Sequence, residues 1–183
     1  MVKAAIKNDH APVFDTQADK KLTAAYFRGL SAYYRHLDSI KARLGQRAYK
    51  FFRFGSEETG LHDGFLMSLN MGDGVGLGQQ HLPKLRFRNR KSVVHMQVLN
   101  YERDVLHVFE FKKLRKVVVD IPSAEPLWFK AGETLGQIYT YEIVAASPKY
   151  LRNEWLLDSG GTITIEFEKL IYRCKRLMAK GSP

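Results

Sequence analysis

The apolar residues of this chain change their spacing at about residue 60. Before that point they recur at every third or fourth position, which is the period of one face of an α-helix. The residues of this stripe are Leu22, Tyr26, Leu30, Tyr33, Leu37, Ile40 and Leu44. After it, apolar and polar residues alternate in short runs, which is the period of a β-strand. Helices followed by strands, without regular alternation of the two, predict an α+β fold rather than a doubly wound nucleotide-binding fold.

Two helices are expected in the first part. Thr16 and Asp19 form a variant of the capping pattern that opens helices, so the first helix is predicted over Gln17–Leu44. Gly45 is suited to end this helix in the left-handed conformation. A shorter helix is predicted over Gln46–Phe54.

The second part is expected to form a six- to seven-stranded, mainly antiparallel sheet or a partly open barrel. A hairpin is predicted within it, because two strong strand patterns flank the polar turn Glu102–Asp104. A short helix is expected at 148–157. The predicted strands are 61–71, 84–90, 92–101, 105–111, 116–121, 136–145 and 162–173.

Length and composition favour one domain, 1–183, with a helical part at 1–60 and a β-rich part at 61–183. The single cysteine, Cys174, excludes an intrachain disulfide and favours a cytoplasmic location. No apolar run is long enough to span a membrane, so a membrane partner is not expected. The excess of 29 Lys and Arg over 19 Asp and Glu favours an anionic partner.

His62 and Asp63 are the candidates for a catalytic pair. Adjacent His and Asp residues bind metal in phosphohydrolases of the His-Asp type, where they lie on a helix. Here they are expected to open a strand, on which neighbours point to opposite faces, so a local role in a turn is favoured. No metal or other cofactor is predicted, and the glycine-rich loop at 72–78 lacks the spacing of a dinucleotide-binding or P-loop motif.

Two further histidines fall in the predicted hairpin. With a three-residue turn, His107 would face Leu99 and His95 would face Phe111, which leaves the two histidines on one face of the sheet. They would stand about 13 Å apart along the strand at ~3.3 Å per residue, too far to share a metal.

Basic residues recur in two segments that are candidates for binding nucleic acid or another anion. In an extended chain the first four would line one face about 6–7 Å apart, a spacing that matches successive phosphates. The alternative is a charged edge strand that prevents sheets from joining. The eight residues are Lys84, Arg86, Arg88 and Arg90, followed by Lys112, Lys113, Arg115 and Lys116.

Three short motifs give the chain a family resemblance. They are Leu61-His62-Asp63-Gly64, Leu99-Asn100-Tyr101-Glu102 and Glu125-Pro126-Leu127-Trp128. Over residues 35–173 the chain resembles small uncharacterised bacterial domains with a Leu-His-Asp-Gly motif, some of which are suspected toxin-immunity proteins. The resemblance implies action by binding a protein rather than by catalysis. Because the chain is basic, such a partner is expected to be acidic.

Three functions remain, in order of preference. The first is a non-enzymatic, soluble binding protein that acts through a protein partner. Its binding surface would be either the exposed sheet face or the basic strand. The second is a nucleic-acid-binding protein that uses the eight basic residues. The third is a metal-dependent hydrolase at His62 and Asp63, which would need further ligands from elsewhere in the fold.

Overall fold

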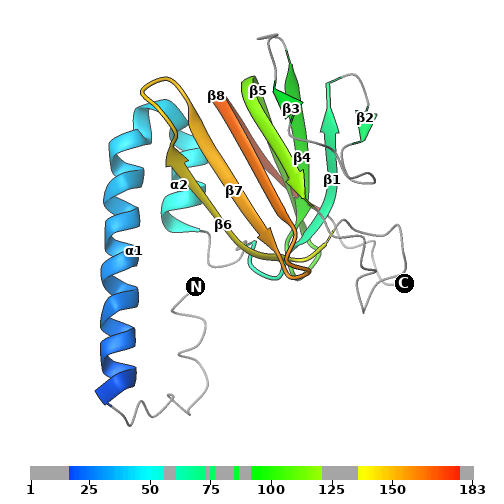
Figure 1. The fold of residues 1–183 in the computed structure, drawn as a ribbon. Coiled ribbons are helices and arrows are strands. Elements are labelled where there is room, and N and C mark those ends of the chain that lie inside the picture. Colours follow the sequence, from blue (N-terminus) through cyan, green and yellow to red (C-terminus); the bar gives the residue numbers. More distant parts are fainter. Residues whose placement is uncertain are drawn as a thin grey trace, which may run out of the picture.

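The computed structural model of the protein describes residues 17–55, 61–72, 75–76, 85–86, 92–120 and 136–177. Two helices precede a single sheet (Figure 1), which confirms the predicted α+β fold. The elements are α1 (Gln17–Leu44), α2 (Gln46–Phe54), β1 (Phe65–Met71), β2 (Val75–Gly76), β3 (Leu85–Arg86), β4 (Val93–Leu99), β5 (Val105–Asp120), β6 (Ile138–Ala145), β7 (Leu151–Leu157) and β8 (Thr162–Arg176). Neither helix combines the length and apolar character needed to cross a membrane.

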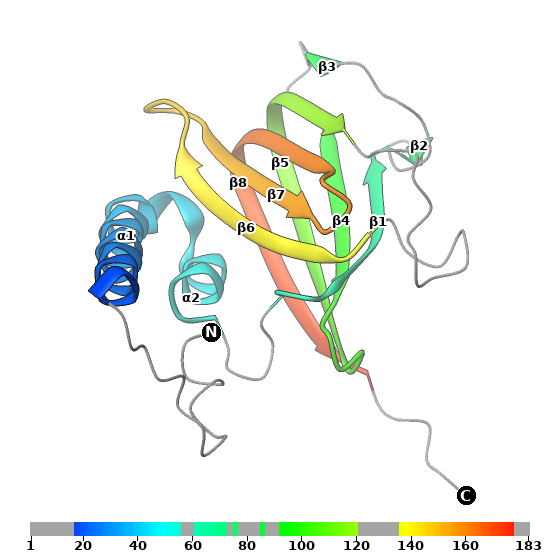
Figure 2. The same ribbon diagram turned by 60° about the horizontal axis from the view of Figure 1, so that its bottom comes forward.

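All strand pairs in the sheet are antiparallel, in the order β2-β1-β4-β5-β8-β7-β6, with β3 paired to β5. Six strands are long and two, β2 and β3, have two residues each. The sheet curls so that the starts of β1 and β6 meet at one end (Figure 2). There Leu66 N donates to Gly136 O at 2.9 Å and Ile138 N donates to Gly64 O at 2.7 Å. The two edges are not joined along their length, so the sheet is not a closed barrel.

The helices lie together beside the curled sheet, α2 against its inner side and α1 next to β6 (Figures 1 and 2). Phe51 of α2 is the central contact, because its ring packs 4.6 Å from Tyr172, 5.3 Å from Phe109 and 5.6 Å from Tyr141 between centroids. The C-terminal half of α1 joins the same core through residues such as Leu37. Helices and sheet therefore share one hydrophobic core.

The outer edge of β6 is covered by side chains of α1. Ile143 N donates to the Tyr33 hydroxyl at 3.1 Å, and Ala145 N donates to His36 Nε2 at 3.2 Å. An uncovered edge strand offers a row of backbone donors to other chains. The helix satisfies two of these donors and protects this part of the edge.

Both helices match their predicted bounds, but several details of the sheet do not. Residues 151–157 form β7 rather than part of a helix. The segments expected as separate strands at 105–111 and 116–121 are one continuous strand, β5, with a register shift between Leu114 and Lys116 and a positive φ of 55° at Lys113. Gly45 has the expected positive φ of 76°, but its ψ of 156° lies outside the left-handed helical region.

The β4–β5 hairpin is shifted by one residue from the predicted register. His95 lies opposite Glu110, and His107 lies opposite Val98. A one-residue shift moves a whole strand face to the other side of the sheet. The two histidines therefore lie on opposite faces, and the prediction that they share one was wrong.

Candidate functional site

His62 and Asp63 lie in a turn before β1, not on the strand itself. Asp63 has a positive φ of 62°, and its carboxylate contacts His62 Nδ1 at 2.8 Å. The backbone of Asp63 binds the start of β6, since its N–H donates to Ile138 O at 2.8 Å and its carbonyl accepts from Gln137 Nε2 at 3.1 Å. Within the described ranges, no cluster of three His, Cys, Asp or Glu residues could hold a metal. The turn therefore has a structural role, because it connects the start of β1 to the start of β6.

The first two motifs of the family resemblance meet in space at this end of the sheet. Gly64 packs so closely that a Cβ at its position would stand 2.8 Å from the Leu99 carbonyl oxygen, so only glycine fits. Phe65 and Leu99 are register partners. Residues of both motifs thus have a structural role, because they pack β1 closely against β4.

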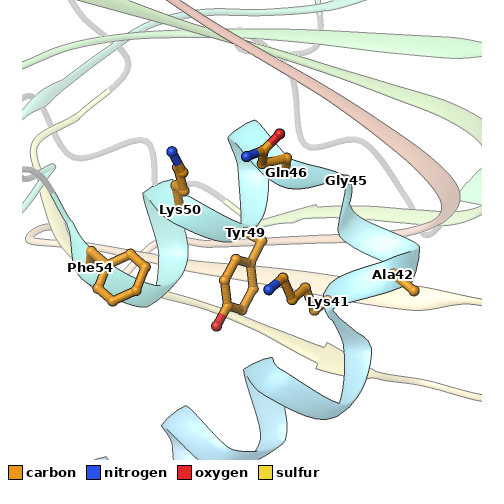
Figure 3. A pocket seen from close by; sticks show the side chains of 7 residues that line it. All are labelled: Lys41, Ala42, Gly45, Gln46, Tyr49, Lys50 and Phe54. Atoms are coloured by element: carbon orange, nitrogen blue, oxygen red, sulfur yellow. The ribbon is translucent and has the colours of Figure 1, made fainter.

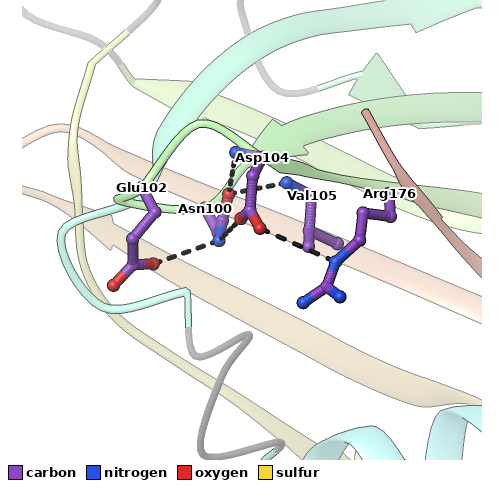
Figure 4. A network of polar contacts seen from close by, with 5 residues as sticks. All are labelled: Asn100, Glu102, Asp104, Val105 and Arg176. Carbon is purple, nitrogen blue, oxygen red and sulfur yellow. Dashed lines mark hydrogen bonds and ion pairs between the residues drawn. The ribbon is translucent and has the colours of Figure 1, made fainter. Parts of the chain in front are cut away.

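Asn100, in the second motif, is fully buried and organises the turn between β4 and β5 (Figure 4). Its Oδ1 accepts from Asp104 N at 3.0 Å and from Val105 N at 2.9 Å. Its Nδ2 donates to Asp104 Oδ1 at 2.7 Å and to Glu102 Oε2 at 3.1 Å. Asp104 also faces Arg176 of β8, with Oδ2 and Nε 3.7 Å apart. The side chain of Asn100 has all its hydrogen-bonding capacity used inside the fold.

The basic cluster of β5 lies against carboxylates. Three of its four predicted anion-binding residues form ion pairs. These pairs are Lys112–Glu110 at 2.8 Å, Lys113–Glu168 at 3.5 Å and Arg115–Glu166 at 2.8 Å. Glu168 also contacts Lys149 at 3.0 Å, and these lysines lower the pKa of its carboxyl, the Lys149 hydrogen bond most of all. Much of the positive charge expected here is therefore neutralised within the sheet.

The first predicted basic segment falls largely outside the described residues, which include none of Lys84, Arg88 and Arg90. Arg86 lies on β3, where its backbone is opposite Lys116 of β5. The structure thus sets the two basic segments side by side at this position.

Within the described residues, the largest group of cations without an ion pair lies on the helices. Residues 17–54 hold nine basic and two acidic side chains, a net charge of +7 out of +10 for the chain. Among the residues of this span whose side chains are described, Arg53 alone forms an ion pair, with Asp38 at 3.3 Å. The other eight basic residues are Lys20, Lys21, Arg28, Arg35, Lys41, Arg43, Arg47 and Lys50. The net charge of the whole chain does not locate this cluster, whereas a count of charges over the two predicted helices finds it.

Large apolar side chains are exposed beside these cations. Leu22 is 74% exposed, Tyr26 55% and Phe27 45%. All three belong to the N-terminal half of α1, and this half of the helix extends beyond the sheet (Figure 1). Phe54, the last residue of α2, is 64% exposed. We define the basic helical surface as these four residues together with the eight unpaired cations. Exposed aromatic and apolar residues among cations are typical of a protein interface.

A cavity of about 510 Å³ lies on this surface where the two helices meet (Figure 3). The hydroxyl of Tyr49 donates to Asp38 Oδ1 at 2.5 Å, and Lys41 Nζ stands 4.9 Å from the centroid of the Tyr49 ring. The hydrogen bond from Tyr49, assisted by Arg53 and Lys41, lowers the pKa of Asp38. Its carboxylate is thus engaged by its own neighbours.

A buried polar pair lies deeper in the core. His107 is fully buried, and its Nδ1 is 2.9 Å from the Tyr172 hydroxyl. Burial lowers the pKa of His107 to about 4, so the ring is neutral near pH 7, and burial also raises the pKa of Tyr172. Both rings pack against Phe51. The pair forms part of the helix–sheet contact.

Two carboxylates face each other on the outer edge of the sheet. Glu142 of β6 and Glu154 of β7 are register partners beside a depression of about 520 Å³. Burial and the hydrogen bond to Glu154 raise the pKa of Glu142. Arg152 contacts Glu154 at 2.9 Å, which offsets part of the repulsion.

No protein-family model, curated protein or solved structure matches this chain.

Proposed function

We propose that this chain is a non-enzymatic binding protein that acts through an acidic protein partner, and that the basic helical surface receives this partner. The observation that carries the proposal is the difference in charge pairing. Three of the four cations of β5 lie against carboxylates, whereas eight cations of α1 and α2 have no ion pair within the described part of the chain. Unpaired cations gain more from an acidic partner, because no internal contact has to be broken.

The exposed apolar residues favour a protein over a nucleic acid. Leu22 and Phe27 offer an aliphatic and an aromatic side chain among the cations of α1. Contacts at the centre of protein interfaces are rich in such apolar anchors, whereas phosphate contacts need only charge and hydrogen bonds. The resemblance to suspected immunity proteins, which act by binding, fits this proposal, with an acidic toxin as the partner.

Site-specific photocrosslinking in the source cell tests the proposal. A photoreactive phenylalanine analogue placed at Tyr26, in the basic helical surface, should crosslink to an acidic protein. The same analogue at Thr164, on the sheet, is the control and should not capture that protein. Capture of nucleic acid at Tyr26, or of the same proteins at both positions, would contradict the proposal.

Nucleic-acid binding is the second candidate function. It is favoured by the register of β3 and β5, which sets Arg86 opposite Lys116. Titration with single-stranded RNA and duplex DNA at low and moderate salt is the test, since each released counterion steepens the salt dependence. Binding that weakens with salt and is lost in Arg86→Ala/Arg88→Ala would favour this function, and no binding would exclude it.

A further inference from the structure

The junction of α1 and α2 forms a concave site within the basic helical surface. Gly45 separates the two helices. Its φ is 76°, a backbone conformation that residues other than glycine rarely adopt. The chain direction changes there, and the cavity of about 510 Å³ opens between the two helices (Figure 3). Each helix contributes one lysine to the lining, Lys41 from α1 and Lys50 from α2. The site therefore offers two cations in a recess rather than on a flat surface.

Two aromatic residues form one part of the lining. Tyr49 and Phe54 line the cavity together and pack edge to face, with centroids 6.2 Å apart. The hydrogen bond from Tyr49 to Asp38 fixes the orientation of the tyrosine ring. Gln46 adds an amide to the lining. A fixed aromatic wall costs little conformational entropy when a ligand binds.

We propose that this cavity is the anchor site for an acidic segment of the protein partner, an inference that rests on the proposed function. A Glu or Asp carboxylate of the segment binds Lys41 and Lys50, and a neighbouring apolar side chain of the segment packs on Tyr49 and Phe54. Charge complementarity selects this occupant, because Asp38, the acidic residue of this region, is already engaged by Tyr49 and Arg53. An inorganic anion would leave the aromatic wall unfilled.

Fluorescence titration with two synthetic peptides tests the inference. One is an amphipathic peptide with Glu and Leu at helical spacing, and the other has Gln in place of every Glu. We expect the full-length protein to bind the Glu peptide and not the Gln peptide. Lys41→Glu/Lys50→Glu should weaken binding about tenfold or more, and Phe54→Ala about threefold, since each removes one part of the recognition.

The matched control is Lys169→Glu/Lys175→Glu, which changes the net charge equally at two exposed residues of β8. It should weaken binding less than about twofold, because long-range attraction falls off over a Debye length. Circular dichroism and thermal unfolding of each variant verify that it is folded.

Two failures have different meanings. Equal binding of the Glu peptide to both double variants would overturn the anchor site and leave the proposed function standing. No binding of the Glu peptide to the wild-type protein, or equal binding of the two peptides, would overturn the proposed function and the anchor site with it. Tighter binding of single-stranded RNA, lost in Lys41→Glu/Lys50→Glu, would assign the cavity to nucleic acid and overturn both.

Discussion

The sheet and the helical pair of this molecule use the same kinds of side chain in opposite ways. On the sheet, Arg115 contacts Glu166, and aromatic residues such as Phe109 and Phe167 are fully buried in the core. On the helices, Lys41 and Lys50 have no carboxylate partner among the described residues, and Phe54 faces solvent. Net charge alone therefore does not locate a binding surface. Changes on the sheet should cost stability, whereas changes on the helical surface should cost binding.

The two phenylalanines of α2 give the strongest contrast. Phe51 is 5% exposed and contacts the sheet, whereas Phe54 is 64% exposed. Phe51→Ala should lower the free energy of unfolding by about 3–5 kcal/mol, because it leaves a cavity at the helix–sheet contact. Phe54→Ala should change it by less than about 0.5 kcal/mol. Urea unfolding followed by circular dichroism measures both, and similar losses would contradict the assigned roles.

The pH dependence of stability reports on the buried His107. Its pKa is lowered from 6.5 to about 4 in the fold, so between these values the unfolded chain binds a proton that the folded chain does not. The free energy of unfolding should fall by about 3 kcal/mol from this residue as the pH drops from 6.5 to 4, and the contribution should vanish above pH 6.5.

His107→Leu should remove that part of the slope. Urea unfolding at several pH values compares the variant with the wild type. Tyr172, the titratable group that His107 contacts, is neutral in this acidic range because burial raises its pKa. An unchanged slope in the variant would show that His107 is not held neutral by burial.

A variant of Asn100 tests how much its buried hydrogen bonds contribute to the stability of the sheet. Asn100→Ala leaves the N–H groups of Asp104 and Val105 without their acceptor at a fully buried position. The expected loss is about 2–3 kcal/mol of unfolding free energy. Gln97→Ala, at an exposed position of β4, should cost less than about 0.5 kcal/mol. Equal losses in thermal unfolding would mean that the Asn100 network adds nothing specific.

The smallest effects separate paired from unpaired cations. Arg115→Gln removes the partner of Glu166, whose side chain is only 6% exposed, and should cost about 1–2 kcal/mol. Lys41→Gln/Lys50→Gln should change stability by less than about 0.5 kcal/mol. Thermal unfolding of both variants makes the comparison, and a larger loss in the helical variant would reverse it.

The helices were predictable to the residue, because one long apolar stripe and one glycine define them. The strand β7 was not, since its inward position Asn153 is polar and interrupts the apolar alternation. Asn153 is buried because its amide donates to Glu142 O at 2.7 Å and accepts from Trp155 Nε1 at 2.6 Å. The spacing of apolar residues does not reveal these two hydrogen bonds. A polar residue at position 153 therefore argued against a strand.

The candidate site was predictable only in part. Net charge led to the proposal of an acidic partner but not to the location of its binding surface, because the charges of β5 are balanced by Glu166 and Glu168 on a strand about fifty residues later. The hairpin register depended on the side chain of Asn100, whose hydrogen bonds hold a longer turn than the predicted one. The ion pairs of β5 join residues far apart in the sequence, and the turn depends on one side chain. The periodicity of apolar residues predicts neither feature.

The most direct test of the basic helical surface is a titration of the isotopically labelled protein with the Glu peptide, followed by nuclear magnetic resonance of the backbone amides. We predict that the amides of α1 and α2 shift most, with the largest changes around Lys41, Tyr49 and Lys50, and that added salt reverses the shifts. Shifts centred on β5 and β8 would instead place the binding surface on the sheet and contradict the account.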